Sequence, residues 1–177
     1  MPAMPKATPK NSPATMQPVL VLELLILLAV ANGTPVVAKR LFGGAFARPL
    51  DSGALFADGR PWFGPSKTIR GVVLATLATT AAAAALGLGW KAGALLGIVA
   101  MAGDLLVSFV KRRLGLAPSS QAVGLDQIPE SLVPLLATRL LLPLTVLDVA
   151  VATTLFFVGE LVLSRLLYKW HVRDRPY

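Results

Sequence analysis

Four apolar stretches dominate this sequence of 177 residues, at 18–38, 71–89, 92–110 and 131–164. A helix needs roughly 20 mostly apolar residues to cross a bilayer core. Only helices and closed barrels satisfy their own backbone hydrogen bonds inside lipid. The charged residues make up 15% of the chain, against about 25% in a typical soluble domain. We therefore expect an all-α membrane protein that crosses the bilayer several times.

The last stretch, residues 131–164, is longer than one span requires and contains Pro134 and Pro143. Proline removes a helical hydrogen bond and kinks or breaks a helix. We therefore expect two helices here, the first of them short or broken, and about five transmembrane helices in all. Residues 1–17 are expected to form a disordered tail, and residues 18–177 a single membrane-embedded catalytic domain.

Basic residues gather at the ends of the apolar stretches. Residues 39–70 carry six Lys and Arg against two Asp, and residues 111–113 read KRR. A short turn joins the second and third stretches, so both basic segments lie on one side of the membrane. An excess of Lys and Arg in short loops marks the cytoplasmic side, which predicts an N-terminus outside and a C-terminus inside. This bias explains the net charge of +8 without a nucleic-acid partner.

One aspartate lies inside the third stretch, in the segment AGDLLVSFVKRRLG at 102–115. An ionisable residue at that depth is costly and usually faces a bundle interior or a polar cavity. At helical spacing Asp104, Ser108 and Lys111 share one face. Two interpretations stay open from this segment alone. Either Asp104 and Lys111 form a structural pair, or the carboxylate holds a divalent cation while the basic residues hold phosphate.

The first basic loop contains a second group of polar residues, in PLDSGALFADGRPWFGPSKTIRG at 49–71. Its glycines allow a backbone to approach a ligand closely, and its Lys and Arg side chains complement phosphate. A helix that starts near Thr68 would present its N-terminus to anions. GPSKT lacks the spacing of a P-loop, so that motif is rejected. The second basic loop adds a carboxylate, Asp126, in the string GLDQ.

These residues place carboxylates and cations at one boundary between membrane and cytoplasm. Carboxylates together with substrate phosphates are the usual ligands of Mg²⁺, and such ions support in-line displacement at phosphorus. The inventory therefore predicts phosphoryl or nucleotidyl transfer to a lipid, without choosing between them. The carboxylates are Asp51, Asp58, Asp104 and Asp126, and the cations are Lys67, Arg70, Lys111 and Arg112.

Several strings together resemble the CDP-archaeol synthase family, whose members are integral membrane cytidylyltransferases related to CDP-diglyceride synthetases. The strings are GDLLVSFVKRRLG, GLDQ, NGTP at 32–35, PLDSG, FADGR, GPSKTIRG and the tail HVRDRPY. SFVKR at 108–112 fits the start of the CDP-diglyceride synthetase motif. The HGG-containing part of that motif has no counterpart, and only GLD at 124–126 resembles its end.

The resemblance implies a reaction in which CTP and a lipid phosphate give a CDP-lipid and pyrophosphate, with Mg²⁺ as cofactor. It implies that Asp104 and Asp126 are metal ligands and that Asp104, Lys67 and Lys111 act in catalysis. No covalent nucleophile is expected, since there is no Cys and the lone His lies in the tail at 171. The expected substrate-binding residues are Asn32, Asp51, Asp58, Thr68, Arg70, Ser108 and Arg112.

Three alternatives remain at this stage. A lipid kinase would need a base beside its nucleophile, and the face of the helix that carries Asp104 offers no Glu. A transporter usually shows paired broken helices or repeat symmetry, and only one broken region is evident. A non-enzymatic membrane scaffold is the third. The expected partners of the chain are CTP, a lipid phosphate and membrane lipids, and the sequence leaves the oligomeric state open.

Overall fold

The computed structural model describes residues 15–118, 120 and 122–169, and these residues form five α-helices. Three of the five are long and apolar enough to cross a membrane. The all-α membrane fold expected from the sequence is therefore confirmed. Most of the expected N-terminal tail, residues 1–14, lies outside the described residues. The helices are α1 (Pro18–Phe42), α2 (Ile69–Ala85), α3 (Trp90–Arg113), α4 (Gln127–Thr138) and α5 (Val146–Lys169).

The long apolar stretch at 131–164 does divide into two helices. The first, α4, has 12 residues and is about 18 Å long at the usual rise, too short to cross the bilayer core. The chain turns after Thr138, passes Pro143 and begins α5 at Val146. Of the two prolines expected to kink or break a helix, Pro143 lies in the break between α4 and α5, whereas Pro134 lies inside α4.

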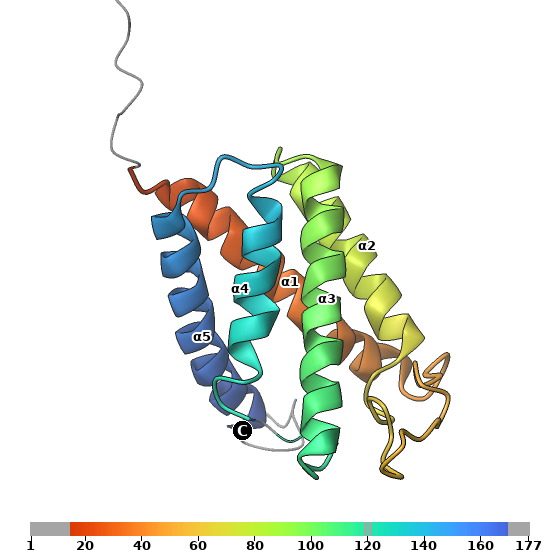
Figure 1. Cartoon of the computed structure of the whole chain (residues 1–177). Coiled ribbons are helices and arrows are strands. Elements are labelled where there is room, and N and C mark those ends of the chain that lie inside the picture. The colour runs from red at the N-terminus through yellow and green to blue at the C-terminus, as the bar shows by residue number, and fades with distance from the viewer. Residues whose placement is uncertain (1–14, 119, 121, 170–177) are drawn as a thin grey trace, which may run out of the picture.

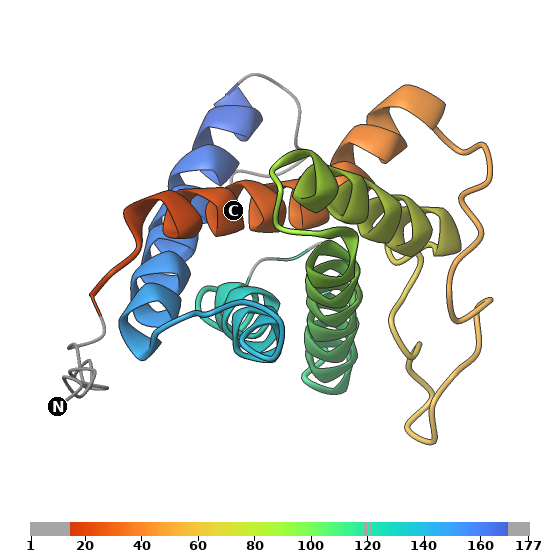
Figure 2. The same ribbon diagram turned by 90° about the horizontal axis from the view of Figure 1, so that it is seen from above.

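The helices pack around α1, which runs obliquely across the others (Figure 1). Seen from above, α3 and α4 lie on one side of α1, and α2 lies beside α3 (Figure 2). Leu24, Leu27 and Leu28 of α1 are fully buried and form the centre of the apolar core with Leu96 and Leu135. The core therefore joins α1 to both α3 and α4 and fixes their relative positions.

Glycine allows α2 and α3 to approach very closely. A Cβ atom at Gly93 would lie 2.5 Å from the Cβ of Ala83 and 2.7 Å from the carbonyl oxygen of Thr79. Small residues at such a crossing are typical of helices packed within a membrane. This contact holds α2 against α3 along its length, so the residues just before α2 lie beside the last turns of α3.

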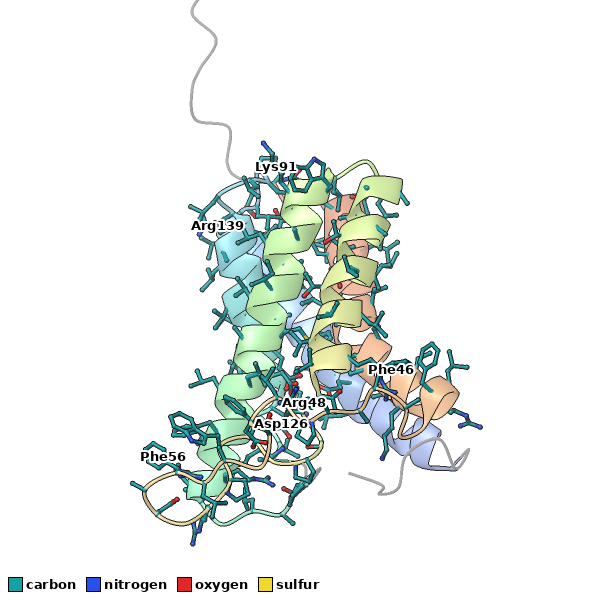
Figure 3. All side chains as sticks on the ribbon, turned by 90° about the vertical axis from the view of Figure 1, so that its right-hand side faces the viewer. Phe46, Arg48, Phe56, Lys91, Asp126 and Arg139 are labelled. Atoms are coloured by element: carbon teal, nitrogen blue, oxygen red, sulfur yellow. The ribbon has the colours of Figure 1, made fainter. Side chains whose placement is uncertain are left out.

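The two basic loops lie at the same end of the bundle, as the charge pattern predicts. Arg60 of the first loop donates from Nη1 to the carbonyl oxygen of Arg113 at 2.6 Å. Asp126 lies at this end, whereas Lys91 and Arg139 lie at the opposite end (Figure 3). Arg139 donates there to the carbonyl oxygen of Leu144 at 3.2 Å. Its side chain is thus remote from the basic loops.

Candidate active site

An ion pair joins the first basic loop to the middle of the bundle. Lys67, two residues before α2, donates from Nζ to the two carboxylate oxygens of Asp104 at 2.5 and 2.7 Å. The side chains are 25% and 19% exposed, so the pair lies at the border between bundle and solvent. The sequence-based alternative of an Asp104–Lys111 pair is wrong, because Lys111 has another partner. Two residues predicted to act in catalysis are therefore in direct contact.

A third ionisable residue meets this pair from α4. The Glu130 carboxyl lies within electrostatic range of Asp104, Lys67 and Glu160. Glu130 is only 7% exposed. The sequence analysis did not assign it to the site, and its contact depends on how α3 and α4 cross. One ammonium group therefore faces more than one carboxyl group.

Gly103 makes this crossing possible. A Cβ atom at Gly103 would lie 2.9 Å from the carbonyl oxygen of Pro129, which is closer than real Cβ contacts. The dipeptides Gly103–Asp104 and Pro129–Glu130 are thus packed against each other. In the sequence, the glycine directly before Asp104 indicates that another helix packs closely at this point. It does not indicate which helix does so.

A second lysine–aspartate pair lies where α3 ends and α4 begins. Lys111 donates from Nζ to the two carboxylate oxygens of Asp126 at 2.9 and 3.1 Å. Lys111 also donates to the Ser120 carbonyl oxygen, and Asp126 accepts from the backbone N–H of Ala122 at 2.7 Å. The two side chains are 10% and 12% exposed. This pair therefore fastens the second basic loop to α3.

Asp51 organises the first basic loop. Its Oδ2 accepts from the backbone N–H groups of Phe63 at 3.0 Å and Gly64 at 2.8 Å, and its Oδ1 accepts from that of Gly53 at 3.1 Å. Burial acts to raise the pKa of Asp51, but the hydrogen bonds from Gly64, Phe63 and Gly53 hold that pKa below its usual value. The carboxylate thus stabilises the turn that leads to Lys67.

Asp58 belongs to a small hairpin that docks on the end of α3. It accepts from Nη1 of Arg113 at 2.6 Å, and Arg113 stacks over the rings of Phe56 and Phe109 at 4.7 and 4.9 Å. Trp62 packs on the same two rings. Phe109 of α3 therefore contacts this loop.

The remaining candidates are held by local backbone contacts. Thr68 caps α2, accepting from the backbone N–H of Gly71 at 3.1 Å, and Asn32 donates to the carbonyl oxygen of Leu28 at 3.0 Å. Arg70 donates to the carbonyl oxygens of Ala45 and Gly43 just after α1. Ser108 is buried one turn after Asp104. Their predicted contacts with substrate stay predictions.

The residues fit a magnesium ion only in part. Within residues 15–118, 120 and 122–169, no three Asp, Glu or His side chains lie close enough together to hold a metal ion. Mg²⁺ usually takes one or two protein carboxylates and completes its shell with water and substrate phosphates. Asp104 suits this role because both its oxygens already contact a cation, the Lys67 ammonium. A site completed by a nucleotide is therefore compatible with the chain.

Comparison with known proteins gives a consistent result. A sequence model of the CarS-like CDP-archaeol synthase family matches residues 84–177. A CDP-archaeol synthase of Methanopyrus kandleri is 40% identical over 141 residues, which cover 74% of this chain and 63% of that protein. A CDP-archaeol synthase of Pyrobaculum calidifontis is 34% identical over 165 residues, which cover 89% of this chain and 98% of that protein.

A solved structure has the same fold. It is described as an intramembrane enzyme for archaeal membrane lipids biosynthesis. Its TM-score is 0.67 at 32% sequence identity, and the alignment covers 82% of this chain and 92% of that one.

Proposed function

The chain belongs to the CDP-archaeol synthase family, and from that premise we propose that it transfers the CMP group of CTP to the phosphate of a membrane lipid. The observation that carries this proposal is the contact of Lys67 with Asp104 beside Glu130. Ionisable groups inside a bundle are costly and usually functional. Here they lie at the end where the basic loops gather, within reach of both a lipid headgroup and a soluble nucleotide.

The reaction forms one P–O bond and breaks another. An oxygen of the lipid phosphate attacks the α-phosphorus of CTP, and the bond from that phosphorus to the bridging oxygen of the pyrophosphate breaks. The attacking phosphate monoester has a second pKa of about 6, so it is largely ionised at neutral pH. No general base is required, and catalysis rests on positioning and on neutralising charge.

The chain supplies carboxylates for a magnesium ion and cations for phosphate. Asp104 and Asp126 would hold Mg²⁺, which when bound neutralises charge on the phosphate oxygens. Lys67 contacts Asp104, and its ammonium would turn to a phosphate oxygen when the nucleotide binds. Lys111 would act in the same way from Asp126, although its contacts with the second loop restrict it more.

A lipid kinase is the nearest alternative chemistry. The sequence argument against it is that the face of α3 that carries Asp104 offers no Glu, but Glu130 of α4 brings a carboxyl group to Asp104 from another helix. Membership of a cytidylyltransferase family favours transfer from CTP instead. The assay below therefore includes ATP as a competing donor.

The decisive experiment incubates membranes that contain the protein with labelled CTP, Mg²⁺ and a panel of lipid phosphates carrying ether-linked isoprenoid or ester-linked acyl chains. We expect labelled CDP-lipid and an equal amount of pyrophosphate. A parallel reaction with γ-labelled ATP should give no phosphorylated lipid. Labelled lipid from ATP but none from CTP would replace the proposal with the kinase.

We further propose that the basic loops face the cytoplasm of the cell membrane. The charge bias of those loops supports this orientation. A cysteine introduced at Ser52, in the first loop, should be protected from an impermeant thiol reagent in intact cells. A cysteine introduced at Lys91, at the opposite end, should be labelled. The reverse pattern would invert the topology.

A further inference from the structure

The aromatic hairpin (residues 54–62) lies against the last turns of α3. Its backbone is closed by the N–H of Phe56, which donates to the carbonyl oxygen of Arg60 at 2.8 Å. The ring of Phe56 meets those of Trp62 and Phe109 edge to face, with centroids 5.0 and 5.3 Å away. Figure 3 shows Phe56 at the basic end, beside α3. These ring contacts fix the hairpin on the surface of α3.

The hairpin packs on the face of α3 that is turned away from the bundle. Ile98 and Leu106 on this face are 56% and 59% exposed, and α3 is long and apolar enough to cross a membrane. Phe109 follows Leu106 by three residues, so at helical spacing both share this face. An exposed apolar face of a membrane-spanning helix meets lipid. The hairpin therefore lies where lipid would otherwise contact the end of α3.

The position along α3 places the hairpin near a boundary of the bilayer core. Trp90 is the first residue of α3 and is 61% exposed, and Trp is enriched at both membrane–water interfaces. At a rise of about 1.5 Å per residue, about 20 residues counted from Trp90 cross a hydrocarbon core of about 30 Å. That count ends next to Phe109, on which Trp62 packs. The two tryptophans are thus separated by about the thickness of one bilayer core.

The one cation inside this cluster of rings is neutralised by the hairpin itself. Arg113 donates from Nη1 to Asp58 at 2.6 Å, and its guanidinium stacks on the rings of Phe56 and Phe109. A surface arginine in water gains little from such a pair. A cation next to lipid is costly unless it is paired or reaches the headgroups. The arrangement therefore suits a layer that is less polar than water.

The outer side of the hairpin is apolar as well. Leu55 pairs with Pro61 in a β-bridge, and neighbouring residues of an extended strand point to opposite faces. Because Phe56 points to α3, Leu55 points away from it, and Leu55 is 62% exposed. Trp62 is also 40% exposed. Large apolar side chains are thus presented on the side that continues the exposed face of α3.

We infer that the aromatic hairpin inserts into the interfacial layer of the bilayer, where Leu55 and Trp62 contact lipid. Its partner is the lipid surface itself, at the boundary between acyl chains and headgroups. Trp62 is followed by Phe63 and Gly64, whose backbone N–H groups donate to Asp51. The hairpin therefore ties the first basic loop to the membrane surface. The inference concerns where this loop lies and does not rest on the proposed reaction.

The test measures depth by tryptophan fluorescence of the purified full chain in phosphatidylcholine vesicles. The sequence has three tryptophans, so Trp90→Phe with Trp170→Phe leaves only Trp62. The lipids carry bromine near the carbonyl end or near the methyl end of their acyl chains, and iodide is the quencher in water. We expect stronger quenching by bromine near the carbonyl end, and a depth of about 15 Å from the bilayer centre.

Ser66→Trp is the matched control, in a protein whose three native tryptophans are replaced by Phe. Ser66 is exposed in the same loop, but its neighbours lie toward the bundle. Gly64 is next to the buried Arg112, and Lys67 contacts Asp104. We expect iodide to quench this position strongly and brominated lipid to quench it weakly. Thermal unfolding of each variant checks that it is folded.

Leu55→Trp in the same background probes the outer side of the hairpin, and brominated lipid should quench it as it quenches Trp62. Iodide quenching of either position as strong as that of Ser66→Trp would place the hairpin in water and overturn the inference. Equal lipid quenching at Ser66→Trp would mean that the hairpin is no distinct anchor, which also overturns it. Weak quenching of Trp62 by both agents would show that protein, such as a second copy of the chain, covers it instead of lipid. No substrate is present, so these results are independent of CDP-lipid formation.

Discussion

The two lysine–aspartate pairs at the basic end use the same chemistry in different surroundings. The Lys67–Asp104 pair joins a loop to the middle of α3, and its other neighbour is a carboxyl group, Glu130. The Lys111–Asp126 pair is more deeply buried, and backbone groups of the second loop contact both of its members. The Lys67 ammonium can therefore leave Asp104 for another ligand without breaking a backbone contact. Lys111 and Asp126 are also hydrogen-bonded to the backbone of the second loop.

This difference separates an ion pair with side-chain contacts alone from one that also holds the backbone of the second loop. The Nζ of Lys67 is hydrogen-bonded to the side chain of Asp104, so a metal ion can replace it there without breaking a contact to the backbone. An ammonium that also holds a backbone carbonyl cannot leave without loosening the loop. We therefore expect substitutions at the first pair to change activity with little effect on stability, and substitutions at the second to change both.

The largest effect is expected for Asp104→Asn, which should reduce CDP-lipid formation to background. The substitution removes the charge that would attract Mg²⁺ while keeping the size of the side chain. Tm should fall by no more than about 3 °C, because the pair is partly exposed. Turnover and thermal unfolding are measured on the same preparation. Activity near the wild-type rate would remove Asp104 from the proposed metal site.

Asp148→Asn provides the contrast for that experiment. Asp148 is fully buried at the opposite end, where it accepts from the backbone N–H groups of Gln17 at 2.8 Å and Thr145 at 2.9 Å. Its loss should lower Tm while the folded protein keeps its turnover. An equal loss of turnover in Asp104→Asn and Asp148→Asn would mean that activity depends on any buried aspartate and would not support a special role for Asp104.

Asp126→Asn should lower both stability and activity. Removing one partner of a buried ion pair costs about 3 kcal/mol or more, so Tm should fall by at least about 6 °C. Activity of the surviving folded protein should drop by about tenfold to a hundredfold, because the proposed Mg²⁺ site loses one of its two carboxylates and the second loop is no longer fixed beside α3. A loss of activity to background at an unchanged Tm would instead make Asp126 equivalent to Asp104.

The sequence predicts which helices, loops and charged residues lie at this end of the molecule. It predicts less well which charged residues contact each other. Apolar length and loop charge predict the helices and the shared side of the loops, since both follow from the properties of lipid. The pairing of Asp104 with Lys67, rather than with Lys111 on its own helix, requires the approach of α2 to α3. The position of Glu130 requires the crossing of α3 and α4 at Gly103. Both contacts depend on tertiary packing, which one sequence does not specify.

Pro134 illustrates the same limit within one helix. A proline in an apolar stretch predicts either a kink or a break, and the sequence does not show which; at Pro134 the helix is not broken, and α4 continues to Thr138. Thr138 donates from its hydroxyl to the carbonyl oxygen of Pro134 at 2.6 Å. Packing of the buried face of α4 therefore outweighs the cost of one missing backbone hydrogen bond.

Lys67→Ala should have a smaller effect than either aspartate substitution. We expect the KM for CTP to rise about tenfold, the usual cost of one charge-assisted hydrogen bond, with kcat reduced less. Lys67→Arg should recover part of the affinity, because it keeps the charge and changes the geometry. Steady-state kinetics over a range of CTP concentrations separate the two parameters. Unchanged kinetics in Lys67→Ala would mean that the ammonium does not leave Asp104 for the nucleotide.

The smallest effect is expected for Asp51, which stabilises the first loop through three backbone N–H groups. Its pKa is lowered in the folded chain, so its contribution to stability is present above the unfolded-state pKa of about 4 and is lost as pH falls through the folded-state pKa. Asp51→Asn should therefore lower Tm by only about 1–2 °C at pH 7, because the side chain is only partly buried and solvent screens its charge. The difference from wild type should shrink as pH falls below about 4. A difference that stays constant with pH would show that the carboxylate charge does not hold the loop, and a KM change as large as that of Lys67→Ala would place Asp51 at the substrate.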